Sequence, residues 1–154
     1  MDLEDLVQKN LMDGTLNLEA RKVGDEGAKR LAGMEILAEV VQLELGDNDI
    51  GNEGVAALCA SPYLSKLKVL NLKSNNITAP GARALAESEN LSQLDQLILK
   101  FNRIGEEGAK FIAASENLGR LTTLDLFRNQ IGPEGARSIK TSKIFQQINR
   151  MRLD

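Results

Sequence analysis

The chain has 154 residues, of which 42% are hydrophobic and only 3% aromatic, and it carries a net charge of −3. This length suits one domain whose core is built from aliphatic side chains. There is no histidine and only one cysteine, which excludes the commonest general base, most zinc sites and an internal disulfide. The acidic balance disfavours nucleic acid and acidic membrane surfaces as partners.

The first predicted element is a helix over residues 1–12. Its apolar residues recur at helical spacing and are Leu3, Leu6, Val7 and Leu11. We expect this helix to cap the open end of the repeats that follow. The segment begins with acidic residues and has no continuous apolar stretch, so it is neither a signal peptide nor a membrane span. Together with the single cysteine, this favours a reducing, cytoplasmic location.

From residue 13 onward the chain follows a repeat of 27 residues. Four units align: VVQLELGDNDIGNEG from Val40, LKVLNLKSNNITAPG from Leu67, LDQLILKFNRIGEEG from Leu94 and LTTLDLFRNQIGPEG from Leu121. They share the frame L-x-x-L-x-L-x-x-N-x-I-x-x-x-G. An atypical first unit starts near residue 13, and a partial last unit covers 148–154. We expect one strand over each L-x-x-L-x-L segment and one helix after each glycine of the frame.

The frame, extended to LxxLxLxxNxIgxxGaxxLa, resembles the ribonuclease-inhibitor-like subclass of leucine-rich repeats over nearly the whole chain. The resemblance implies a single α/β domain over residues 1–154. It would form a curved right-handed solenoid with a parallel sheet on the concave face and helices on the convex face. The subclass includes inhibitors, sensor regions of NOD-like receptors, GTPase-activating proteins and bacterial effectors. Most of these proteins bind another protein through the concave face or the adjoining loops.

Two positions of the frame are predicted to be structural. The asparagines, Asn48, Asn75, Asn102 and Asn129, should form a buried ladder that hydrogen-bonds backbone groups in every coil. Loss of one such bond would cost ~1–3 kcal/mol. The glycines, at positions 27, 54, 81, 108 and 135, are too dispersed for a phosphate-binding loop, and we expect close packing there. Cys59 lies in the helical run VAALCA and is predicted to be a small buried residue.

Function should depend on the variable residues between the leucines, because these residues face the concave side. Acidic residues lie on the early strands and basic residues on the later ones, and three apolar residues, Ile98, Phe101 and Phe127, lie on adjacent strands. Aromatic residues ringed by cations are typical of protein-binding hot spots. The alternative is that these residues have no binding role, because single exposed apolar residues are ordinary and Phe101 could fold back over its loop. The predicted protein-binding residues are Glu44, Lys73, Ile98, Lys100, Phe101, Asp125, Phe127 and Arg128.

The leading functional hypothesis is a non-catalytic module that binds a partner protein, with no cofactor, no metal, no nucleic acid and no membrane. One alternative is a GTPase-activating or enzyme-regulating protein that supplies Arg103 or Arg128 to a partner's active site. Another is a segment of a larger sensor or effector assembly, and an effector would be intracellular after delivery. The strand over 148–153 should be a sheet edge that could form a homodimer, although Arg150, Arg152 and Asp154 discourage edge pairing.

Overall fold

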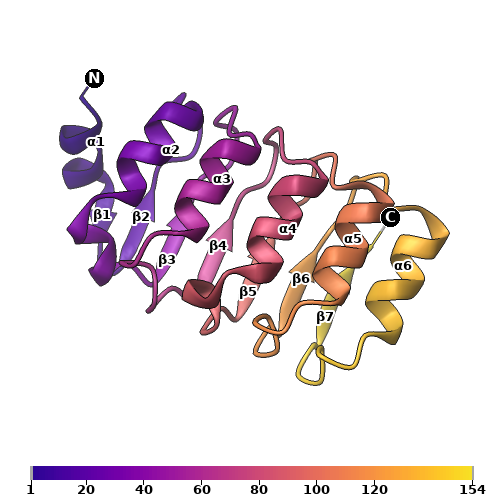
Figure 1. Ribbon diagram of the computed structural model, residues 1–154. Helices are drawn as coiled ribbons and strands as arrows, with labels where there is room; N and C mark the ends of the chain where they lie inside the picture. The colour runs from indigo at the N-terminus through magenta and orange to yellow at the C-terminus, as the bar shows by residue number, and fades with distance from the viewer. Residues whose placement is uncertain (1, 154) are drawn as a thin grey trace.

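The computed structural model describes residues 2–153 and contains one sheet with a row of helices along it (Figure 1). The helices are α1 (Leu3–Asn10), α2 (Gly24–Ala32), α3 (Asn52–Cys59), α4 (Ala79–Glu87), α5 (Gly105–Ala113) and α6 (Gly132–Thr141). The strands are β1 (Leu11–Met12), β2 (Thr15–Asn17), β3 (Gln42–Glu44), β4 (Val69–Asn71), β5 (Gln96–Ile98), β6 (Thr123–Asp125) and β7 (Arg150–Arg152). Two short 3-10 turns, Glu35–Glu39 and Glu89–Leu91, lead from helices back to strands. The predicted α/β solenoid is confirmed.

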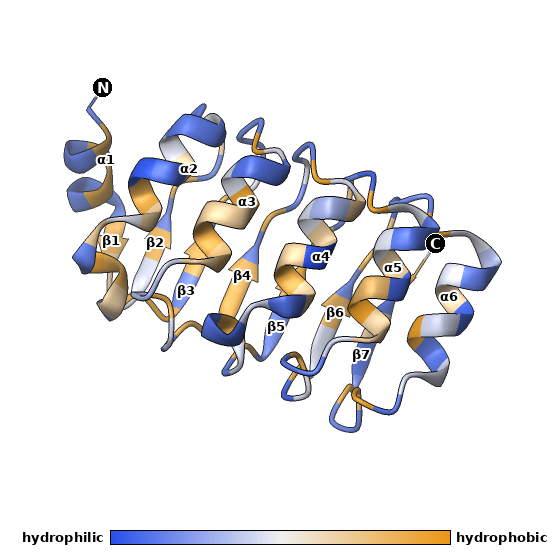
Figure 2. Cartoon of the chain, in the orientation of Figure 1, coloured by the Kyte–Doolittle hydropathy of each residue, from blue (hydrophilic) through white to orange (hydrophobic). Residues whose placement is uncertain are grey.

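The strands lie side by side in chain order, and β2 to β7 are parallel. Each paired residue is 27 positions from its partner, so equivalent leucines of successive units stack in register. The stacked residues are Leu16, Leu43, Leu70, Leu97, Leu124 and Met151. Figure 2 shows both apolar and hydrophilic segments on the row of helices, as amphipathic helices packed on a sheet require. The frame leucines and isoleucines are therefore buried between the two layers.

The N-terminal end differs from the predicted helix over residues 1–12. Helix α1 ends at Asn10, and β1 pairs antiparallel with β2. Asp13 and Gly14 form the two-residue connection, with φ of 50° and 79°. Asp-Gly is a strong signal for a tight hairpin whose two central residues both adopt positive φ. The spacing of the apolar residues did not indicate this turn, because Leu11 continues the helical pattern although it belongs to the strand.

The helices also begin earlier than expected. Gly54, Gly81, Gly108 and Gly135 lie inside the first turn of α3 to α6 and do not precede it. Their close packing is confirmed: a Cβ added at Gly108 would lie 2.5 Å from Ile104 Cγ2 and 3.2 Å from Ala82 Cβ. Real Cβ atoms essentially never approach others to 2.5 Å. Glycine at this position therefore allows each helix to pack against the preceding one.

The predicted asparagine ladder is confirmed. Asn48 Oδ1 accepts hydrogen bonds from the backbone N–H groups of Arg21 and Val23, and Asn75 Oδ1 accepts them from Asn48 and Ile50. The amide nitrogens donate in turn to backbone carbonyls of the same coil and the preceding one. All four frame asparagines are buried. Each amide thus pairs buried backbone groups in two neighbouring coils.

A second ladder, of serines, was missed at the sequence level. Ser61, Ser88, Ser115 and Ser142 each donate their hydroxyl to a carbonyl at the end of the preceding helix; the acceptors are Ala32, Cys59, Ala86 and Ala113. The last carbonyls of a helix have no partner within the helix, so these serines satisfy them from the next coil. The signal was present in the sequence, because the four serines are 27 residues apart.

Candidate functional site

One row of side chains crosses the sheet on the face opposite the helices. Its members alternate with the buried leucines and are in register: Asn17, Glu44, Asn71, Ile98, Asp125 and Arg152. Two positions further along each coil lies a second row, Glu19, Gly46, Lys73, Lys100 and Phe127. We call these two rows the concave face. The predicted binding residues belong to them, except Phe101 and Arg128, which each follow the second row by one position.

The polar groups over β2 to β4 are bonded to one another. Lys73 Nζ lies 2.8 Å from Glu19 Oε1, although these residues belong to coils two apart. Gly46 lies in the coil between them, and a Cβ added there would approach Lys73 Cγ and Cε to 2.9 Å. The lysine stem therefore passes over the glycine to reach the glutamate. Glu44 Oε2 accepts a hydrogen bond from Asn71 and Oε1 accepts one from Gln42, each at 2.7 Å.

The surface over β5 to β7 has a different character. The rings of Phe101 and Phe127 form an edge-to-face pair with centroids 5.8 Å apart and planes at 78°. Phe101 is 47% exposed, while Phe127 and Ile98 are half-buried. Phe101 does not fold back over its own loop as the alternative required, since its ring meets a ring of the next coil. The structure thus brings together Phe101 and Phe127, and Ile98 is adjacent on β5.

Three cations surround this ring pair. Lys100 Nζ lies 6.0 Å from the centroid of Phe101, and the guanidinium carbons of Arg128 and Arg152 lie 5.3 Å and 4.5 Å from that of Phe127. Such distances are those of cation–π contacts. Arg152 was not among the predicted binding residues, although it stands 27 positions after Asp125 in the same row. We refer to Ile98, Lys100, Phe101, Phe127, Arg128 and Arg152 as the aromatic–basic patch.

Asp125 does not present its side chain as predicted. It is only 8% exposed, because Oδ1 accepts a hydrogen bond from the backbone N–H of Phe127 at 3.0 Å. Asn17 and Asn71 make the equivalent bond in their own coils. Its other oxygen, Oδ2, lies 3.8 Å from Arg152 Nη1. Asp125 therefore acts as a turn-forming residue and partial counterion within the sheet face.

Two residues of the patch, Phe101 and Arg128, have an unusual backbone conformation. One position in each coil has positive φ, the one before the frame asparagine or, in the first coil, before Arg21. Its residues are Ala20, Asp47, Ser74, Phe101 and Arg128, at 54° to 60°. Non-glycine residues adopt this left-handed region infrequently, and a bulky residue there is a clear outlier. The φ of 60° at Phe101 belongs to the repeat, whereas the aromatic side chain is particular to this coil. An aromatic residue is thus kept at a position that disfavours it.

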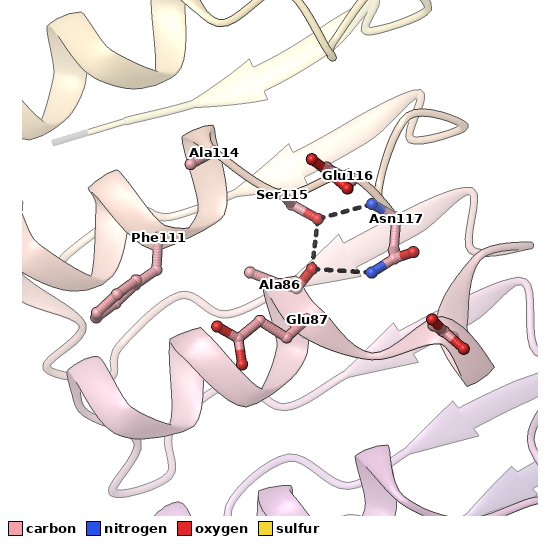
Figure 3. A pocket seen from close by; sticks show the side chains of 8 residues that line it. Ala86, Glu87, Phe111, Ala114, Ser115, Glu116 and Asn117 are labelled. Atoms are coloured by element: carbon pink, nitrogen blue, oxygen red, sulfur yellow. Dashed lines mark hydrogen bonds between the residues drawn. The ribbon is translucent and has the colours of Figure 1, made fainter.

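Two other features of the molecule, a cysteine thiol and a surface hollow, are weaker candidates for a functional site. Burial raises the pKa of the Cys59 thiol to about 12, so this residue is an inert part of the core. A hollow of about 350 Å³ lies between the ends of α4 and α5 (Figure 3). Its Ser115 and Asn117 both donate to the Ala86 carbonyl, so these polar groups are used in the bonds between coils.

Across residues 2–153 no group of three or more acidic or cysteine side chains could hold a metal, and no helix has the length and apolar character needed to cross a bilayer.

Comparisons with known proteins agree with this architecture. A family model described as "Leucine Rich repeat" matches residues 40–59, 63–86, 93–113 and 121–140, which is more than half of the chain. The crystal structure of an internalin (inlF) from Listeria monocytogenes is similar, with 26% sequence identity and a TM-score of 0.52. That similarity covers 82% of this chain but only 37% of the internalin. No match was found among curated proteins.

Proposed function

Because the chain belongs to the leucine-rich repeat family, we propose that it is a non-catalytic module that binds a partner protein through the concave face and the adjoining loops. The observation that carries the proposal is the exposed pair formed by Phe101 and Phe127. An aromatic pair that only served stability would be placed in the core, where its area is removed from water. Here Phe101 is 47% exposed on the open side of the sheet, at a backbone conformation that disfavours a bulky residue, and Phe127 is half-buried.

The energetics of interfaces favour the same site. Hot spots are small groups of residues, often aromatic or arginine, and truncation of one costs ~2 kcal/mol or more. The aromatic–basic patch contains two phenylalanines and two arginines on adjacent coils. On the concave surface of the first coils, Lys73 and Glu19 form an ion pair and Glu44 accepts hydrogen bonds from Asn71 and Gln42, so these polar groups already have partners.

The test is a binding comparison between the unmodified chain and the double variant Phe101→Asn and Phe127→Ala. Partners are captured from an extract of the source cells on both proteins and quantified by mass spectrometry. The protein retained by the unmodified chain is then titrated against both. We expect a loss of at least ~30-fold, equivalent to ~2 kcal/mol.

A matched control is Ser74→Asn, which makes the same substitution at the same repeat position outside the patch. Its affinity should stay within twofold of the unmodified chain. Equal retention of every captured protein by the double variant would contradict the proposal. Asparagine is chosen for position 101 because it tolerates the left-handed region, so that folding is preserved.

Finer assignments are part of the same proposal. Each complete coil carries an α-helix of 8–10 residues, which supports the ribonuclease-inhibitor-like subclass. Residues 1–154, with the N-terminal cap helix included, are proposed to act as one domain, since within the described residues α1 packs on β2 and each coil packs on the next. The free buried thiol of Cys59 supports a reducing, cytoplasmic location.

An enzyme-regulating role in trans is the runner-up. Arg103 and Arg128 are exposed after the ends of β5 and β6, where a partner's active site could meet them. Arg128 is already packed near the Phe127 ring, which favours simple binding. Accelerated GTP hydrolysis by any member of a panel of small GTPases, abolished by Arg103→Ala or Arg128→Ala, would instead support the regulating role.

Self-association through β7 is a separate candidate. Within the described residues β7 pairs only with β6, so its outer edge is open. Arg150 and Arg152 are both exposed on this strand, and their like charges oppose pairing with a second copy. The third residue predicted to discourage pairing, Asp154, lies outside the described residues. Light scattering of the purified chain at low and high salt would reveal a dimer if one forms.

A further inference from the structure

We propose that the partner segment bound by the aromatic–basic patch is acidic, and that it inserts an apolar or aromatic side chain between aspartates or glutamates. This inference rests on the proposed function and specifies the chemistry of the partner. It follows from two properties of the patch: an excess of cations beside the rings, and an apolar centre in which Phe101 is exposed.

The first property is an excess of positive charge around the rings. Lys100 and Arg128 have no carboxylate within ion-pair distance among residues 2–153. Arg152 has one, Asp125 at 3.8 Å, but that carboxylate also accepts a backbone hydrogen bond from Phe127. Three cations therefore lie beside the two rings, and only one of them has a carboxylate nearby, on a chain whose net charge is −3. Counterions that complete this cluster would come from the partner.

Elsewhere on the surface several cations are paired within the chain. On the helices, Lys29 pairs with Glu53 of the next coil and Lys110 pairs with Glu106 one turn away. On the concave face Lys73 is neutralised by Glu19 across two coils. Other surface cations, such as Lys66 and Lys140, also lack an ion pair among the described residues, so what distinguishes Lys100 and Arg128 is their position beside two aromatic rings.

The second property is the apolar centre of the patch. Phe101 and Phe127 meet edge to face, and Ile98 is half-buried beside them on β5. An apolar side chain from the partner would cover the exposed part of Phe101 and remove it from water. Carboxylates on either side of that side chain would then lie near Lys100 and Arg128, which flank the two rings. Charge complementarity of this kind increases association rates and fixes orientation.

Single-stranded nucleic acid is the competing occupant of a surface with aromatic rings and cations, because bases stack on open ring faces. Both rings here have cations toward them: Arg152 is 4.5 Å and Arg128 5.3 Å from the Phe127 centroid, and Lys100 is 6.0 Å from that of Phe101. The arrangement therefore favours an acidic peptide.

The experiment is a selection from a random library of displayed 12-residue peptides on the immobilised chain, with depletion on the variant F101N/F127A. We expect the retained peptides to combine aspartate or glutamate with phenylalanine, tyrosine or leucine. Affinity of a retained peptide, measured by fluorescence anisotropy, should fall at least tenfold in the variant K100E/R128E. The control K140E/K143E changes the net charge equally on the convex side and should alter affinity less than twofold.

The outcomes separate the two proposals. Peptides that require Phe101 and Phe127 but are basic or uncharged would overturn the acidic partner and leave protein binding by the patch intact. Peptides that bind the double phenylalanine variant equally, or no enrichment over it, would overturn both. A labelled oligonucleotide of twenty thymidines is the third probe, and binding that is lost in F101N/F127A would assign the patch to nucleic acid.

Discussion

The concave face over β2 to β4 and the concave face over β5 to β7 share one backbone arrangement but present opposite surfaces. In the first region Lys73, Glu19 and Glu44 bond to residues of the same face. In the second region two aromatic rings meet, and two of the three cations beside them, Lys100 and Arg128, have no carboxylate within ion-pair distance among the described residues. A polar surface that satisfies itself has little to gain from a partner, whereas an exposed aromatic pair does. The comparison locates the proposed binding site in the later coils.

The largest expected effect tests whether the two regions share the same framework. Asn75→Ala removes a side chain that accepts from the backbone N–H groups of Asn48 and Ile50, so two buried donors lose their partner. We expect a loss of ~3 kcal/mol in the free energy of unfolding, measured by urea denaturation. Asn102→Ala, in the later region, should cost a similar amount, within ~1 kcal/mol, because it removes the equivalent ladder bonds. A loss below ~1 kcal/mol for both variants would contradict the ladder's structural role.

A smaller effect is expected from the pair that neutralises the early coils. Glu19→Gln leaves Lys73 without its counterion, and both side chains are 30–39% exposed. Surface pairs of this kind contribute at most ~1 kcal/mol. A double-mutant cycle with Lys73→Met should give a coupling energy of this size that disappears at ~1 M salt, where the screening length is ~3 Å. Absence of coupling at low salt would mean that the early region is not internally neutralised.

The smallest stability effect is expected where the binding effect is largest. Phe101→Asn relieves the left-handed conformation of a bulky residue but loses the edge-to-face contact with Phe127. These contributions, ~1 kcal/mol and ~0.5–1.5 kcal/mol, oppose one another, so the melting temperature should barely change. Leu99→Ala is the contrast, since this fully buried neighbour should cost ~2–5 kcal/mol. A similar loss in both variants would show that Phe101 is a core residue.

The fold could be predicted from the sequence more completely than the candidate site, for a physical reason. Periodic leucines, asparagines and glycines predicted the strands, the asparagine ladder and the close helix packing. Each of these positions has the same surroundings in every coil and is therefore filled by the same residue type. The Asp13–Gly14 hairpin occurs once, so the repeat could not indicate it. The serine ladder does repeat, but small polar residues are common in loops, so their spacing alone does not indicate a buried hydrogen bond.

The candidate site was harder to predict because side-chain partners depend on rotamers and not on spacing alone. Sequence alternation placed Phe101, Phe127 and Ile98 on adjacent coils. It did not show that Lys73 passes over Gly46 to Glu19, nor that Asp125 turns toward the Phe127 backbone. Sequence alternation therefore placed these side chains on one face but could not distinguish charges that are bonded within the chain from those that are not.

The ladders determine how such a chain can change its length. Asparagine and serine bonds between coils join residues 25 to 30 positions apart, always to the preceding coil. Removal of a whole 27-residue unit would leave every remaining coil bonded to an equivalent neighbour, whereas deletion of one residue would misalign all of these bonds in its coil. Length can therefore vary only in whole coils. Insertion of a unit between β4 and β5 would move the aromatic–basic patch by one strand relative to the early coils and leave both surfaces intact, whereas removal of a unit would delete part of one of them.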